Sequence, residues 1–200
     1  MNLVIIKYNA GNIQSVLYAL ERIGVSATVT DNVAEIQQAE KVIFPGVGEA
    51  SSAMRYLKER GLDNVIRNLQ QPVLGICLGM QLMCRFSEEN NVDCLNIFDE
   101  DVKFFAKAAA EDNRLKIPQI GWNNIYDLKT PLFNNVPNNS YTYFVHSYYA
   151  ALGEHTIATT NYILPYSSAL HKNNFYGTQF HPEKSAGVGE QILKNFVEII

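Results

Sequence analysis

Cys77 is the residue whose neighbours in the sequence best suit a nucleophile. It lies in residues 73–81, a short apolar run that ends in Gly-Ile-Cys-Leu-Gly and passes directly into a helical pattern. A strand, a sharp turn and a helix start in this order place the turn residue at the apex. Gly75 and Gly79 lack a Cβ atom, so the backbone can turn tightly and a substrate carbonyl can approach the sulfur.

A buried structural cysteine is the alternative, and for an isolated cysteine it would be the preferred interpretation. Cys77 is also predicted to stand at a helix N-terminus, where free N–H groups and the positive end of the helix dipole favour a thiolate. The same N–H groups can hold a developing oxyanion. This position and the two flanking glycines together favour the nucleophile.

His181 and Glu183 are the second pair of residues with a chemical use. They lie in residues 176–185, where the predicted strand ends at Phe180, and their spacing in an extended chain directs both side chains the same way. A histidine near Cys77 can take the thiol proton and hand it to a leaving amine, while a carboxylate orients the imidazole. A surface His-Pro-Glu turn is the alternative, but a Cys–His–Glu triad accounts for both motifs at once.

Residues 45–48, Pro-Gly-Val-Gly, follow a predicted strand at the end where open α/β sheets bind their ligands. Gly46 and Gly48 allow a backbone N–H to turn towards a reacting centre. Alone, the motif also fits a simple tight turn, but beside the Cys77 elbow it becomes the natural second half of an oxyanion hole. Gln81 lies one helical turn after Cys77, so its amide can reach a substrate bound at the sulfur.

The elements that must position these groups follow an α/β order. Apolar strand patterns alternate with helical patterns in the first third of the chain, which predicts parallel strands joined by right-handed crossovers. Two later aromatic segments alternate like antiparallel strands and are expected to extend the sheet on one side. The expected fold is α/β, a mostly parallel central sheet flanked by helices with an antiparallel extension. Predicted strands include 2–6, 27–30, 41–44, 102–105, 117–123 and 141–149, predicted helices are 13–23, 33–38, 49–59, 62–69, 78–85 and 188–200, and 107–111 fits a short helix or a loop.

Composition limits the possible function classes. The chain has 200 residues with 47% hydrophobic content and no linker, so one domain is expected over residues 1–200. The net charge of -4 offers no basic stripe for nucleic acid. Without a long apolar run or a signal-peptide pattern, the protein is expected to be cytoplasmic. Cys77, Cys84 and Cys94 lack metal-ligand spacing and suit a reducing compartment, so neither a metal nor a cofactor is expected.

His146 and Trp122 lie in the later aromatic segments, and each has a structural interpretation beside a functional one. His146 fits a packed, hydrogen-bonded strand histidine better than a catalytic residue. Trp122 is the only tryptophan, and its position is as compatible with a core anchor as with a functional residue.

Several segments together resemble the class I (triad-type) glutamine amidotransferases. The Gly-x-Cys-x-Gly elbow and the His-Pro-Glu segment occur across the wider superfamily. The Pro-Gly-Val-Gly, Gly-Trp-Asn and Tyr-Phe-Val-His segments narrow the resemblance to the glutaminase subunits that serve histidine biosynthesis. The matching segments cover nearly the whole chain and are residues 10–12, 44–48, 75–82, 87–89, 121–123, 143–148 and 179–185.

The resemblance implies a single-domain amidotransferase fold and a role for each site residue. Cys77 would be the nucleophile, His181 the general base and acid, and Glu183 the group that orients the imidazole. Backbone N–H groups around Val47 and Leu78 would form the oxyanion hole. The other glutamine-binding residues that the resemblance implies are Gly46, Gly48, Gln81, Glu89, Ser147 and Tyr148.

The resemblance also implies a partner. Ammonia released from L-glutamine would pass directly to a separate cyclase (synthase) subunit, which would be a (β/α)₈ barrel bound as a heterodimer. Asn12, Trp122 and Lys184 each follow a motif at the expected C-terminal end of a strand, so they are expected around the mouth of the site and at the partner interface. Neither a nucleic acid nor a membrane is expected as a partner.

Two other classes use overlapping features. A stand-alone cysteine hydrolase, such as a γ-glutamyl hydrolase or a peptidase, would use the same triad but would turn over without a partner. A non-catalytic binding subunit would require an inert Cys77, although the triad residue types are all present. A glutamine-mimicking electrophile discriminates between these classes, because an amidotransferase would be labelled at Cys77 rather than at Cys84 or Cys94.

Overall fold

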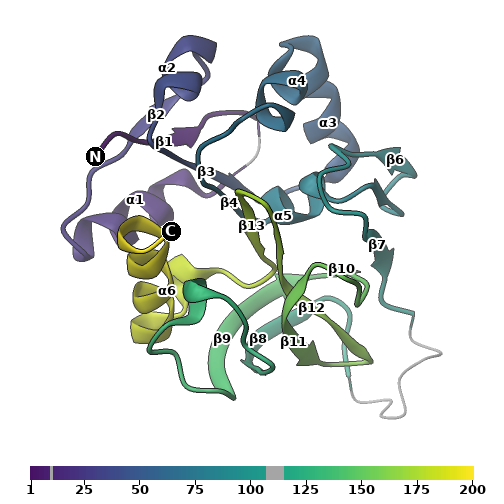
Figure 1. Ribbon diagram of the computed structural model, residues 1–200. Coiled ribbons are helices and arrows are strands. Elements are labelled where there is room, and N and C mark those ends of the chain that lie inside the picture. The colour runs from purple at the N-terminus through teal and green to yellow at the C-terminus, as the bar shows by residue number, and fades with distance from the viewer. Residues whose placement is uncertain (10, 107–114) are drawn as a thin grey trace.

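The computed structural model describes residues 1–9, 11–106 and 115–200, and one 11-stranded sheet runs through it with helices on both faces (Figure 1). The helix or loop expected at 107–111 lies outside the described residues. Among the residues that are described, no helix combines the length and the apolar character needed to cross a membrane.

Parallel strands form the half of the sheet that carries the elbow. The spatial order is β2, β1, β3, β4 and β13, and each neighbouring pair in this series is parallel. The α/β class expected from the sequence is therefore confirmed. The bounds are β1 Leu3–Ile6, β2 Thr28–Thr30, β3 Lys41–Gly46, β4 Val73–Cys77 and β13 Phe175–Thr178.

The alternation of side chains along β1 explains why the core has two layers. Val4 and Ile6 pack into one buried cluster, whereas Leu3 and Ile5 pack into the other, because successive strand residues point to opposite faces. Helices α2 to α5 cover the first cluster, and α1 and α6 cover the second. The bounds are α1 Ile13–Arg22, α2 Val33–Gln38, α3 Ala50–Glu59, α4 Leu62–Arg67, α5 Leu78–Met83 and α6 Ala186–Glu198.

The antiparallel extension begins with a hairpin partner of β13. Strand β12 pairs antiparallel with β13, and β10 and β7 continue the sheet beyond it in antiparallel pairs. Strand β11 pairs with β12, and β5 and β6 close the far edge. The bounds are β5 Phe86–Ser87, β6 Val92–Asp93, β7 Asp101–Phe104, β10 Tyr148–Ala150, β11 Thr156–Asn161 and β12 Pro165–Lys172.

A two-stranded ribbon lies outside the main sheet. Strands β8 (Gln119–Ile125) and β9 (Ser140–His146) pair with each other as a separate antiparallel sheet. The expectation that residues 117–123 and 141–149 jointly extend the main sheet is therefore wrong for the ribbon. The physical reason is that the chain leaves the ribbon at Ser147 and enters the main sheet only as β10.

The close approach of α5 to β3 generates a prediction about Gly79. A Cβ atom added at Gly79, the second residue of α5, would overlap the carbonyl oxygen of Phe44 in β3. Gly79→Ala should therefore lower the free energy of unfolding by about 1–3 kcal/mol, the usual cost of overpacking. Urea denaturation of wild type and variant measures this change.

Gly187 provides the matched control, because it is the second residue of α6 and an added Cβ atom would meet nothing within 4 Å. Gly187→Ala should leave the free energy of unfolding unchanged or raise it by up to about 1 kcal/mol through helix propensity. Equal stabilities for the two variants would contradict the packing argument.

Candidate active site

Strand β4 and helix α5 meet at a sharp turn with Cys77 at its apex. Cys77 has φ 52° and ψ −108°, a conformation that L residues rarely adopt and that is typical of functional sites held by surrounding packing. A Cβ atom added at Gly75 would overlap Met83 Cε and lie 2.8 Å from the backbone nitrogen of Met80. The structure thus places the thiol at the turn predicted from the sequence, and packing of α5 on β4 requires the glycine.

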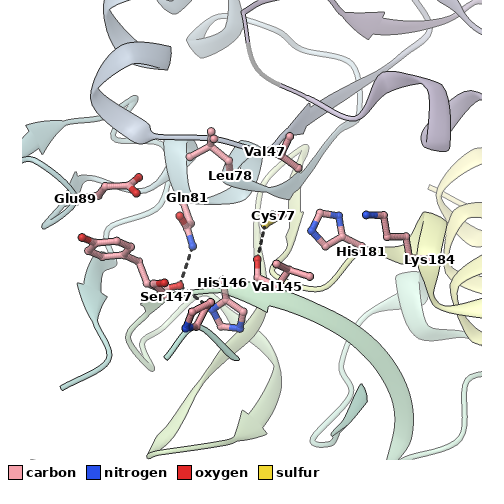
Figure 2. Close-up of a pocket in the computed structure, with 13 residues that line it drawn as sticks. Val47, Cys77, Leu78, Gln81, Glu89, Val145, His146, Ser147, His181 and Lys184 are labelled. Atoms are coloured by element: carbon pink, nitrogen blue, oxygen red, sulfur yellow. Dashed lines mark hydrogen bonds between the residues drawn. The ribbon is translucent and has the colours of Figure 1, made fainter. Parts of the chain in front are cut away.

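A cavity of about 310 Å³ opens at this turn (Figure 2). Its walls come from the loop after β3, the elbow, the junction of β9 and β10, and the segment after β13. Within the described part of the chain, no group of three or more His, Cys, Asp or Glu side chains is arranged to hold a metal ion. The lining residues are Val47, Gly48, Cys77, Leu78, Gln81, Glu89, Pro118, Val145, His146, Ser147, Tyr148, His181 and Lys184.

His181 and Glu183 form a buried pair beside Cys77. Nδ1 of His181 lies 2.7 Å from Oε1 of Glu183, and the two side chains are 3% and 2% exposed. Burial by itself lowers the pKa of His181, but the charge and hydrogen bond of a Cys77 thiolate, together with Glu183, raise it to about 10. The site therefore favours a cationic imidazole beside the sulfur.

The backbone of this pair differs from the prediction. Strand β13 ends at Thr178, and His181 precedes a 3-10 turn, η3 (Pro182–Lys184), that contains Glu183. The expectation that an extended chain directs both side chains the same way is therefore wrong. Pro182 fixes its own φ near the helical value and starts the turn, and the turn returns the carboxylate to the ring.

Gln179 also contacts the nucleophile, and the sequence analysis did not identify it. Its Nε2 atom donates to Cys77 Sγ at 3.7 Å, while Sγ lies 3.8 Å from the carbonyl oxygen of Val145. The side chain is fully buried and does not belong to the cavity wall. The signal that could have found it is its place in the sequence, because Gln179 lies two residues before His181, directly after β13.

Most residues expected to bind glutamine lie in the cavity wall, but Gly46 does not. Gly46 is the last residue of β3 and pairs with Cys77 of β4. A Cβ atom added at Gly46 would overlap the hydroxyl oxygen of Tyr8 and lie 2.8 Å from Leu78 Cβ. The structure therefore gives Gly46 a packing role under the elbow.

Glu89 and Gln81 present oxygen atoms to one end of the cavity. Oε2 of Glu89 accepts a hydrogen bond from the N–H of Ala50 at 2.7 Å. Burial raises the pKa of Glu89, and nearby Glu49 adds to this, although the Ala50 hydrogen bond opposes it. Nε2 of Gln81 donates to Tyr148 O at 2.9 Å, so the remaining amide oxygen of Gln81 is the group left for a ligand.

His146 lines the cavity but is held as a neutral, packed residue. Its Nδ1 atom lies 2.8 Å from Tyr148 O, and because a carbonyl only accepts, Nδ1 carries the proton. Burial lowers the pKa of His146 to about 4, with the cationic His181 contributing and the Tyr148 carbonyl opposing. This arrangement fits the hydrogen-bonded strand histidine and supplies no second base at pH 7.

The residues expected at a partner interface lie at different depths. Trp122 is 53% exposed on β8 and packs edge-on against Tyr143 of β9. The N–H of Tyr143 donates to Ser185, which directly follows Lys184. Lys184 lines the cavity, whereas Asn12 precedes α1 and is not part of the wall. The structure thus connects Trp122 to the Lys184 segment, and helix α1, which Asn12 precedes, contacts the same segment.

Comparisons with known proteins identify the family of the chain. The family model described as "Glutamine amidotransferase class-I" matches residues 4–200. A protein named "Imidazole glycerol phosphate synthase subunit HisH" from Bacteroides fragilis is 60% identical over 199 residues, covering 100% of both chains. A protein of the same name from Haemophilus influenzae is 47% identical, covering 99% of this chain and 98% of its own.

Solved structures support the fold. A structure described as a glutamine amidotransferase gives a TM-score of 0.73 at 17% identity, covering 98% of this chain and 97% of that one. Another glutamine amidotransferase, from Thermotoga maritima, gives a TM-score of 0.62 at 17% identity, covering 99% and 81%. At these identities the likeness shows the same α/β architecture.

The charges around His181 generate a prediction for its titration. Cys77→Ala removes the thiolate that raises the pKa of His181 most, so that pKa should fall below about 10 while Glu183 remains in place. NMR titration of the His181 ring protons measures the change. Cys84→Ala is the control, because Cys84 lies in the other core cluster from Cys77, and it should leave the titration unchanged. An unchanged His181 titration in Cys77→Ala would contradict the thiolate–imidazolium pair.

Proposed function

The chain belongs to the class-I glutamine amidotransferase family, and we propose that it is the glutaminase subunit of an imidazole glycerol phosphate synthase. It hydrolyses L-glutamine to glutamate and ammonia. The ammonia passes to the cyclase subunit HisF, which makes imidazole glycerol phosphate and an aminoimidazole carboxamide nucleotide in histidine biosynthesis. The observation that carries the proposal is one cavity that joins Cys77 at a strained elbow to the His181–Glu183 pair.

Cys77 and His181 share the covalent steps. The Cys77 thiolate attacks the γ-amide carbon of glutamine, and the His181 imidazolium gives its proton to the departing amide nitrogen. Ammonia leaves and a glutamyl thioester remains on the sulfur. His181 then takes a proton from water, the hydroxide attacks the thioester, and glutamate is released with the thiolate restored. Glu183 holds Nδ1 of the ring throughout, so Nε2 is the nitrogen that exchanges protons.

Backbone N–H groups of Val47 and Leu78 stabilise the oxyanion in this proposal. Both residues line the cavity beside Cys77. Leu78 is the first residue of α5, so its N–H has no intrahelical acceptor. Gly48 has φ 121°, a conformation open to glycine, which lets the loop after β3 present its peptide groups to the cavity. Removing one such donor typically costs about 10²–10³ in rate.

The amino-acid end of glutamine binds beside Glu89 and Gln81. Burial disfavours the negative charge of the Glu89 carboxylate, and the ammonium group of the substrate compensates this cost. Oε1 of Glu89 can accept from the ammonium, because the Ala50 N–H uses Oε2. The Gln81 amide oxygen accepts a second hydrogen from the same ammonium. Ser147 and Tyr148, at the junction of β9 and β10, lie in the same wall and hold the carboxylate end.

The partner is HisF, which in this proposal is a (β/α)₈ barrel that binds the chain as a heterodimer. The ribbon supports the proposed interface, because Ile120, Trp122 and Tyr141 expose 63%, 53% and 61% of their surfaces. Exposed aromatic residues of this kind are typical anchors of protein interfaces. Lys184 and Asn12 complete the docking face. A cytoplasmic location is part of the proposal, because Cys77, Cys84 and Cys94 are all free thiols.

A complex that carries Cys77→Ala tests the proposal. With ammonium salts it should make imidazole glycerol phosphate at a rate close to wild type, because only ammonia generation is lost. With glutamine it should make none above background. Product formation by the purified heterodimer with each nitrogen source is the measurement.

Cys84→Ala is the matched control and should use both nitrogen sources, because its thiol is buried away from the cavity. If the Cys77→Ala complex were inactive with both nitrogen sources, the two-subunit function would be wrong. Full glutaminase activity of the isolated chain would instead identify a stand-alone hydrolase.

A further inference from the structure

The Cys77 sulfur accepts a hydrogen bond from a side chain that the mechanism above does not use. We propose that Gln179 is a positioning residue for the nucleophile, whose amide N–H stabilises the negative charge on the Cys77 sulfur. The inference rests on the proposed glutaminase reaction and adds a further residue to its site.

The Tyr148 carbonyl sets the orientation of the Gln81 amide. Tyr148 O can only accept, so the Gln81 atom that lies 2.9 Å from it must be Nε2. The same nitrogen lies 2.8 Å from the side chain of Gln179. A second nitrogen cannot accept its hydrogen, so the Gln179 atom at that contact must be Oε1.

This orientation leaves the nitrogen of Gln179 for Cys77. Nε2 of Gln179 lies 3.7 Å from Cys77 Sγ and donates to it. Neither amide can be reversed without placing oxygen against oxygen or nitrogen against nitrogen in a buried contact, which costs more than a lost hydrogen bond. The Tyr148 carbonyl thus fixes the orientation of both amides, so the Gln179 N–H points at the sulfur before any substrate binds.

The backbone after β13 holds the Gln179 side chain on the catalytic side of the chain. The N–H of Gln179 donates to Ser168 O, and the N–H of His181 donates to Tyr143 O. Between them, Phe180 is fully buried and packs against Phe144 of β9. The residues on either side of Phe180, Gln179 and His181, both reach the Cys77 sulfur.

A fixed donor acts at the steps in which the sulfur carries charge. It raises the fraction of Cys77 that is present as the thiolate, and it stabilises the same thiolate as the leaving group when water opens the thioester. The neutral thioester gains less from the bond, so the effect is on kcat. Gln179 does not line the cavity, and the Michaelis constant for glutamine should therefore change little.

Gln179→Leu removes the donor while keeping a side chain of similar size. Loss of a hydrogen bond to a charged group should lower kcat for glutamine hydrolysis by about 10- to 100-fold in the complex with the synthase subunit, with KM changed less than about threefold. Alkylation of Cys77 by iodoacetamide in the same complex should slow by a similar factor. The alkylation readout does not depend on the chain being a glutaminase.

Thr178→Val is the matched control. Thr178 is the neighbouring residue, is also fully buried, and its hydroxyl has no hydrogen-bond partner among the described residues. The replacement has nearly the same shape and touches nothing at the sulfur, so kcat and the alkylation rate should stay at the wild-type values.

Gln179→Glu separates hydrogen bonding from packing. The introduced carboxyl group still accepts from Gln81, but it can donate to the sulfur only while it is protonated. Its kcat relative to wild type should therefore fall as the pH rises, whereas a loss of packing would give a ratio that does not depend on pH.

Equal alkylation rates for wild type and Gln179→Leu would overturn the proposal. So would an unchanged kcat with a raised KM, which would assign Gln179 to substrate binding. If wild type itself failed to hydrolyse glutamine in the complex, the proposed function would be wrong, and the alkylation rates would still decide the role of Gln179.

Discussion

The contact between the first turn of α5 and the backbone of β3 is the constraint on which the site depends. Gly79 lies directly against the carbonyl of Phe44, so helix and strand approach more closely than any side chain would allow. Gly177 of β13 leaves room for the Met80 side chain of α5. The elbow, the loop after β3 and the segment that carries His181 are therefore held at fixed separations by packing at these two glycines.

The charge of each histidine in the site depends on the groups that pack against it. Burial opposes a cationic His181, and only the negative charges of Cys77 and Glu183 reverse that preference. His146, which is equally buried but faces a neutral carbonyl, stays uncharged. Two histidines of one cavity thus differ in charge because their partners differ.

The sequence predicted the parts of this molecule that depend on local pattern. The parallel strands and the elbow follow from apolar periodicity and paired glycines, and the fold confirms them. The separate ribbon was missed because an alternating strand looks the same whichever sheet it joins. Gln179 was missed because its role arises from contacts with Gln81 and Tyr148, which are distant in the chain. The 3-10 turn at Glu183 was missed because a two-residue spacing fits both backbones.

The ribbon of β8 and β9 has a mechanical consequence for the catalytic groups. Its inner main chain contacts the Cys77 sulfur through the Val145 carbonyl and accepts a hydrogen bond from the His181 N–H through the Tyr143 carbonyl. Its outer residues, including Trp122 and Tyr141, face solvent. Because one strand of the ribbon, β9, contacts both the Cys77 sulfur and the His181 backbone, a displacement of the ribbon reaches nucleophile and base together. The ribbon thus connects the exposed aromatic surface to the two groups that react with the substrate.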